Sequence, residues 1–136
     1  MLRAVQAAVE SGLPTVAECG GFLYLHQELG DEAGRLWPMC GVIPGASTKQ
    51  PRLVRFGYSE ISGEDSMLFR AGETYRVHEF HYWDTTADGS DMTLTKVSNG
   101  KQWSFGYASE TLYAGFPHLY LGGGGLAERF VSACRK

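Results

Sequence analysis

The sequence has 136 residues, a net charge of −3 and an isoelectric point near 5.8, which is enough chain for one domain with a hydrophobic core. It has no basic stretch to support nucleic-acid binding, and no apolar run approaches the roughly 20 residues that span a bilayer. We therefore expect neither a nucleic-acid nor a membrane partner. Its three cysteines, Cys19, Cys40 and Cys134, lack metal-ligand spacing, which favours a reducing, cytoplasmic setting over a disulfide scaffold.

The first half of the chain is predicted to mix short helices and strands. Leu2, Val5, Ala8 and Val9 recur at helical spacing, and Gly12 is typical of the residue that follows a helix. The predicted elements are a helix over 2–11, a strand over 13–17, a helix over 22–29, a polar turn over 31–36 and a strand over 39–43.

The second half is predicted to be mostly strands, because its apolar residues alternate with polar ones at a period of two. Turn residues separate these segments, and Asn99-Gly100 is a strong hairpin signal. The run Gly122–Gly125 then leads into a final helix. The predicted elements are strands over 53–61, 74–83, 92–97, 102–107 and 111–121, and a helix over 126–134.

Residues 15–25 place one cysteine where a nucleophile belongs. Val16 and Ala17 end a short strand, Cys19 follows, and Gly20-Gly21 leads into an apolar run that can start a helix. Strand, tight turn and helix are the parts of a nucleophile elbow. A glycine neighbour relieves crowding, its N–H is a candidate oxyanion donor, and the helix N-terminus would favour the thiolate. A small core cysteine explains the same motif equally well.

His118 is the candidate base for this cysteine. It lies near the end of the strand predicted over 111–121, and a late histidine after an early cysteine is the order expected of a Cys–His pair. A histidine in a strand is, however, more often structural. His26 lies one turn beyond Phe22 on the predicted helix, and we interpret it as a surface or partly buried residue without a catalytic role.

Segment 78–82 has an unusual density of polar and aromatic side chains. His78 and His81 would point to opposite faces of a strand, so we predict no metal site there. His78, Phe80 and Tyr82 would share one face. Lining a substrate site and a purely structural role account for the segment equally well. The candidate substrate-binding residues are Glu18, beside the cysteine, and His78, Glu79, His81 and Tyr82.

Two further features concern cofactors and domain organisation. Gly122–Gly125 precedes a helix but lacks the Lys-Ser/Thr of a P-loop and the context of a Rossmann motif, so it is interpreted as a turn. The chain also begins with a helix, whereas a strand that carries a nucleophile normally has other strands before it in a parallel sheet. This order predicts an incomplete domain whose leading strands lie elsewhere.

Three segments together resemble a known enzyme family. They are Ala17-Glu18-Cys19-Gly20-Gly21-Phe22-Leu23-Tyr24-Leu25, Arg76-Val77-His78-Glu79-Phe80-His81-Tyr82 and His118-Leu119-Tyr120-Leu121. In this order they resemble the C-terminal glutamine amidotransferase domain of the cobyrinate a,c-diamide synthase family. The resemblance implies an α/β fold of the class I glutamine amidotransferase type, a flavodoxin-like layered domain, here without its N-terminal strands. Residues 1–136 would then be one amidotransferase domain, a C-terminal fragment of a larger synthetase.

The resemblance also implies a reaction. Cys19 matches the nucleophile that attacks the glutamine side-chain amide, and His118 matches the histidine that activates it. The released ammonia would amidate the a and c acetate side chains of a corrinoid, which is held by a separate synthetase domain. That domain would use ATP and Mg²⁺, while this one would need no cofactor. Glutamine and the corrinoid are thus the implied partners, and a homo-oligomer is a further possibility.

One departure from related enzymes concerns the catalytic residues. Amidotransferases with a catalytic triad carry a glutamate two residues after the histidine, where this chain has Tyr120. We therefore predict a Cys–His dyad. The alternatives are a non-catalytic module of the same fold, the glutaminase domain of a cobyric acid synthase, and an unrelated cysteine hydrolase such as a peptidase.

Overall fold

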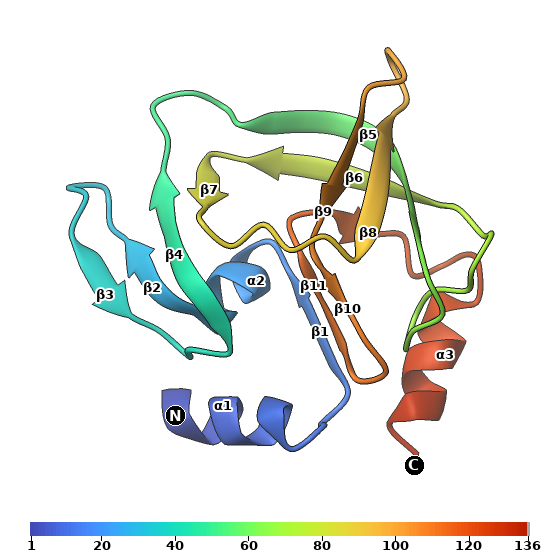
Figure 1. The fold of residues 1–136 in the computed structure, drawn as a ribbon, viewed down its shortest axis with the longest axis horizontal. Coiled ribbons are helices and arrows are strands. Elements are labelled where there is room, and N and C mark those ends of the chain that lie inside the picture. The colour runs from blue at the N-terminus through green and yellow to red at the C-terminus, as the bar shows by residue number, and fades with distance from the viewer. Residues whose placement is uncertain (136) are drawn as a thin grey trace.

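The computed structural model describes residues 1–135 as three helices and twelve strands, and the strands form three sheets (Figure 1). This mixture of helices and sheets is the predicted α/β class. Figure 1 shows the first and last helices at the periphery of the molecule, with the sheets between and above them. No helix within residues 1–135 is long and apolar enough to cross a membrane.

The smallest sheet carries the strand that leads to Cys19. Its order is β1 (Thr15–Glu18), β11 (Leu112–Gly115) and β10 (Tyr107–Ala108). β1 and β11 run parallel, with Glu18 opposite Gly115, whereas β10 and β11 are antiparallel. The predicted first helix is α1 (Leu2–Glu10), and Gly12 makes the turn into β1 at a φ of 91°. Because β1 and β11 end together, the residues that follow them lie side by side.

A five-stranded antiparallel sheet carries His118. Its order is β12 (His118–Leu119), β6 (Tyr75–His81), β5 (Arg55–Gly63), β8 (Met92–Lys96) and β9 (Gln102–Phe105). The predicted hairpin at Asn99-Gly100 is confirmed: it joins β8 to β9, and Gly100 has a φ of 71°. The Lys101 N–H donates to Asn99 Oδ1 at 3.0 Å, a local bond that holds the turn.

The third sheet has four strands, in the order β3 (Leu36–Pro38), β2 (His26–Gly30), β4 (Ile43–Lys49) and β7 (Trp83–Thr85). The helix predicted over 22–29 is wrong in its second half, because α2 (Gly20–Leu25) ends at Leu25 and β2 begins at once. Pairing of β2 with both β3 and β4 supplies the backbone hydrogen bonds that a longer helix would have made itself.

The strand predicted over 39–43 is also displaced, because β4 starts at Ile43 and continues through Pro44 and Gly45. These two residues fall where the register between β2 and β4 shifts, between the pairs His26–Ile43 and Glu28–Ala46. A bulge of this kind accommodates a proline, which has no N–H to give to the ladder.

Three segments predicted as single strands are each divided between two sheets. Segment 74–83 breaks at Tyr82 into β6 and β7, and segment 102–107 breaks at Gly106, whose φ is 80°, into β9 and β10. Segment 111–121 breaks at Phe116-Pro117 into β11 and β12. A period of two therefore identified extended backbone correctly, but it carries no information about which sheet the backbone joins.

Aromatic side chains fill the core between these sheets. Phe22 of α2 packs edge-on against Phe105 of β9 and Phe116, with ring centroids 5.7 Å and 5.1 Å apart. Phe105 and Phe116 stack at 5.5 Å, and all three rings are buried. This cluster ties the helix after Cys19 to the segment just before His118. The final helix is confirmed as α3 (Leu126–Ala133).

Candidate active site

Cys19 sits in a strained turn between β1 and α2. Its φ of 48° and ψ of −103° make it the one non-glycine residue with a positive φ among residues 1–135. The Cys19 N–H donates to the Gly115 carbonyl at 2.9 Å, and the Leu23 N–H donates to the Cys19 carbonyl at 3.0 Å. Such a conformation costs about 1–3 kcal/mol and is held here from both sides. The predicted strand, turn and helix are therefore present, with the cysteine at the strained position.

Gly20 leaves open space beside the sulfur. A Cβ built on Gly20 would meet no atom within 4 Å, whereas one on Gly21 would contact Ala17 Cβ at 3.6 Å. Relief of crowding is thus not what Gly20 provides. Its contribution is its N–H, which bonds to the Cys19 thiolate and so opposes the rise in the pKa of that thiol. An N–H in this position is also suited to stabilise an oxyanion.

The pKa of the Cys19 thiol is nevertheless raised above its ordinary value. Burial is the largest cause, and the negative charge of Glu18 raises the pKa further. The start of α2 does favour the thiolate, because the Gly20 N–H lowers the pKa of the thiol, but burial outweighs this effect. α2 has only six residues, and its one N–H bond does not offset burial. A base must remove the proton from the thiol before Cys19 can act as a nucleophile.

In the structure His118 lies close to Glu18, the residue that precedes Cys19. Glu18 Oε2 lies 3.8 Å from His118 Nδ1, and Glu18 Oε1 accepts a hydrogen bond from the Leu119 N–H at 2.8 Å. The His118 side chain is 45% exposed, so it is open to a ligand from solvent. Within residues 1–135 no hydrogen bond joins Cys19 to His118, as is common in unliganded sites where such bonds tighten only with substrate.

Two of the candidate substrate-binding residues lie in the interior. Glu79 and His81 are 1% and 5% exposed, and Glu79 Oε1 is 3.6 Å from His81 Nε2 and 3.9 Å from Arg55 Nε. His81 Nδ1 donates to the Trp83 carbonyl at 2.7 Å, and its ring stacks on Phe116 at 3.8 Å. His81 therefore packs against Phe116, two residues before His118, and neither Glu79 nor His81 reaches the exposed surface.

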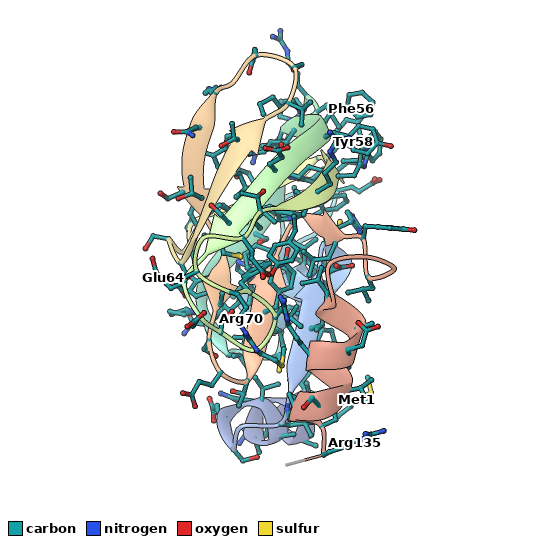
Figure 2. All side chains as sticks on the ribbon, turned by 90° about the vertical axis from the view of Figure 1, so that its right-hand side faces the viewer. Met1, Phe56, Tyr58, Glu64, Arg70 and Arg135 are labelled. Atoms are coloured by element: carbon teal, nitrogen blue, oxygen red, sulfur yellow. The ribbon has the colours of Figure 1, made fainter. Side chains whose placement is uncertain are left out.

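The opposite face of β6 presents an exposed aromatic row that continues to His118. Register places His118 opposite His78, and His78 opposite Tyr58 of β5. Phe56 and Phe80 form the next row, with ring centroids 6.0 Å apart. Figure 2 shows Phe56 and Tyr58 projecting from this outer face. Sequence reasoning missed these two residues, although the period of two in segment 53–61 places both on one side.

Tyr82, the remaining candidate, is 39% exposed and lies 5.9 Å from Phe80 between ring centroids. It therefore extends the same aromatic face. His26 was predicted to be a surface or partly buried residue, but it is fully buried. Its Nδ1 is 2.8 Å from the Phe22 carbonyl and its Nε2 is 2.6 Å from Thr85 Oγ1, so it ties α2 to β7.

The Gly122–Gly125 run forms a turn before α3. Gly122 and Gly124 lie close to aromatic rings, since a Cβ on either would come within 2.9 Å of Tyr120 or Tyr75. The run is thus a turn, as predicted, and it packs against the rings of Tyr120 and Tyr75. Among residues 1–135 no group of three or more His, Cys, Asp or Glu residues could hold a metal. A cavity of about 640 Å³ lies beside α3, and neither Cys19 nor His118 lines it.

A cysteine elbow after a parallel strand, with a histidine close to the glutamate that precedes the cysteine, is found here in an α/β domain of the class I glutamine amidotransferase type. Residues 1–125 match the family model described as the CobB/CobQ-like glutamine amidotransferase domain, and the chain belongs to this family. The resemblance inferred from the three sequence segments is thereby confirmed.

Curated relatives carry the name cobyrinate a,c-diamide synthase. The chain is 36% identical to the protein of Salmonella typhimurium, 38% to that of Listeria monocytogenes and 34% to that of Priestia megaterium. These matches cover 88%, 88% and 98% of this chain, but only 27%, 27% and 30% of the relatives. The chain therefore spans less than a third of the length of the synthases that it matches.

Proposed function

We propose that the chain hydrolyses glutamine through Cys19 and supplies ammonia to a cobyrinate a,c-diamide synthase reaction. The observation that carries this proposal is the strained backbone of Cys19, at the elbow of a chain that belongs to an amidotransferase family. Strain of this kind concentrates at functional sites and has no evident use in a cysteine that only fills space. The position of His118 beside Glu18 supports the same assignment.

In the proposed reaction, His118 accepts the thiol proton as Cys19 Sγ attacks the carbon of the glutamine side-chain amide. The Gly20 N–H stabilises the oxyanion that forms. Return of the proton from His118 to nitrogen lets ammonia leave, and a glutamyl thioester remains on Cys19. Water, deprotonated by His118, then attacks the thioester, and glutamate leaves as the thiol is restored. Glutamine and water thus become glutamate and ammonia.

The rest of the reaction lies outside the chain's own residues. By the names of the relatives, the ammonia acceptor is cobyrinate, whose carboxyl groups a and c become amides. We assign the activation of those carboxyl groups by ATP and Mg²⁺, and the binding of the corrinoid, to the part of the relatives that this chain does not match. The exposed aromatic face beside His118 is the surface on which glutamine would approach.

Tyr120, which stands where related enzymes carry the triad glutamate, favours a second candidate, a non-catalytic domain of the same fold. A glutamine-like chloroketone separates the two. Under the first proposal it should add once, at Cys19, and not to Cys19→Ala, while Cys134→Ala should label normally. His118→Ala should slow the labelling. Absence of labelling at Cys19 would favour the non-catalytic domain, and preferential labelling by a peptide-like chloroketone would favour a peptidase.

A further inference from the structure

Glu18 joins the two segments that carry the proposed nucleophile and base. It is the last residue of β1, directly before Cys19, yet its carboxylate bonds to Leu119, 101 positions later in the chain. One oxygen accepts from the Leu119 N–H at 2.8 Å, and the other lies 3.8 Å from His118 Nδ1. A single carboxylate therefore contacts both the backbone and the ring of the histidine segment.

We propose that Glu18 is the positioning residue for His118, taking the place of the triad acid that this chain lacks. It fixes the histidine backbone through Leu119 and, with the oxygen that faces Nδ1, keeps the proton on that nitrogen. Nε2 is then left unprotonated and free to accept the Cys19 proton. The inference rests on the proposed function, because it gives Glu18 a part in the same proton transfer.

Glu18 is the neighbour of His118 that offers a carboxylate to hold the imidazole ring. Tyr120, at the position of the usual triad glutamate, is 72% exposed and carries no charge to hold an imidazole. His78 faces His118 from the neighbouring strand, but it offers a ring rather than a carboxylate. The Glu18 side chain is only 26% exposed, so solvent screens its interaction with the ring only partly. Tyr113 Oη donates to the Pro117 carbonyl at 2.8 Å and holds the same segment independently.

The variant Glu18→Gln separates positioning from a simple neighbouring charge. Glutamine has nearly the same size and can still accept from the Leu119 N–H, but it carries no charge to retain the proton on Nδ1. The charge of Glu18 raises the pKa of the Cys19 thiol, so its removal alone should lower that pKa and speed capture of Cys19. If Glu18 positions His118, capture should instead slow. The two roles predict opposite signs.

The experiment measures the rate at which a glutamine-like chloroketone captures Cys19 in the 136-residue chain. We expect Glu18→Gln to slow capture about 10- to 100-fold, taking as a guide the cost of losing a group that orients a metal-bound histidine. Glu18→Ala, which also loses the bond to Leu119, should be slower still. Glu28→Gln, an exposed residue of β2, is the matched control and should leave the rate unchanged.

A second readout reports the histidine directly. Nitrogen chemical shifts of His118 should show the proton on Nδ1 in the native chain and a shift toward Nε2 in Glu18→Gln. Faster or unchanged capture with an unchanged tautomer would overturn the inference. If capture still depended on Cys19 and His118, the proposed function would survive that result. If the native chain were not captured at Cys19 at all, the proposed function itself would fail.

Discussion

Replacing Cys19 by glycine should leave a more stable fold than replacing it by alanine, although both changes remove the proposed nucleophile. The backbone at Cys19 has a φ of 48° and a ψ of −103°, where a side chain with a Cβ is strained by about 1–3 kcal/mol. Glycine relieves this strain because it has no Cβ. The matched variant is Cys19→Ala, which also removes the sulfur but keeps the Cβ and therefore the strain.

The expected difference follows from two opposing effects. Glycine regains the strain of about 1–3 kcal/mol, but its unfolded chain has more freedom, which costs about 0.5–1 kcal/mol relative to alanine. Loss of the half-buried sulfur is common to both variants and cancels. Cys19→Gly should thus be more stable than Cys19→Ala by about 1 kcal/mol, or about 4 °C in melting temperature for a chain of this size.

Urea unfolding followed by circular dichroism measures this difference, provided that the two variants have equal dependence on urea. The control is Ala7→Gly on the exposed side of α1, which should be destabilising by about 1 kcal/mol, the opposite sign. If Cys19→Gly were less stable than Cys19→Ala by the amount found at Ala7, the elbow would hold no strain. The main support for a nucleophile at Cys19 would then be lost.

Iodoacetamide should label exposed Cys134 first, half-buried Cys19 second and buried Cys40 last. Exposure sets the access of the reagent, and burial raises the pKa of the Cys19 and Cys40 thiols, which slows their reaction. Peptide mapping that found Cys19 labelled first would contradict this order. This reverses the order that the elbow motif alone predicts. Burial lowers the pKa of His26 below its ordinary 6.5, so the unfolded chain binds the proton more tightly and the free energy of unfolding should fall as the pH drops below 6.5. His26→Gln should flatten that pH dependence in urea titrations. β1 lies at the edge of its sheet, and no strand within residues 1–135 pairs with its outer side, so light scattering should show self-association that grows with concentration. A monodisperse monomer at high concentration would argue against an open edge.

Elements whose signals are local were predicted well from sequence. α1 and α3 have apolar residues at helical spacing. In β5 and β8 apolar and polar residues alternate, and the Asn99-Gly100 turn reverses the chain between β8 and β9 as its residues indicate. The failures involve pairing with distant segments. Residues 26–29 join a sheet instead of extending a helix, because β3 and β4 offer them hydrogen bonds that no local pattern encodes.

In the candidate site, too, features set by neighbouring residues could be predicted, and contacts between distant segments could not. The elbow could be recognised because strand, cysteine, glycine pair and helix are adjacent in sequence, and its strained φ follows from that order. The contact between Glu18 and His118 could not, because it depends on the parallel register of β1 with β11. Sequence alternation did separate Glu79 and His81 from His78, but it could not say which of the two faces is buried.

The break between β11 and β12 is what allows His118 to reach the elbow. Gly115 lies opposite Glu18, and in an unbroken strand His118 would stand about 10 Å further along, three residues at about 3.3 Å each. A glutamate side chain could not bridge that span. Phe116 instead turns into the core and Pro117 ends the ladder, so the chain crosses to β6 and Leu119 approaches to 2.8 Å from Glu18. Lengthening this crossover, for example by one glycine after Pro117, should therefore separate His118 from Cys19 and slow chloroketone capture, even if urea unfolding shows the fold intact. Unchanged capture would mean that the crossover does not set the position of the histidine.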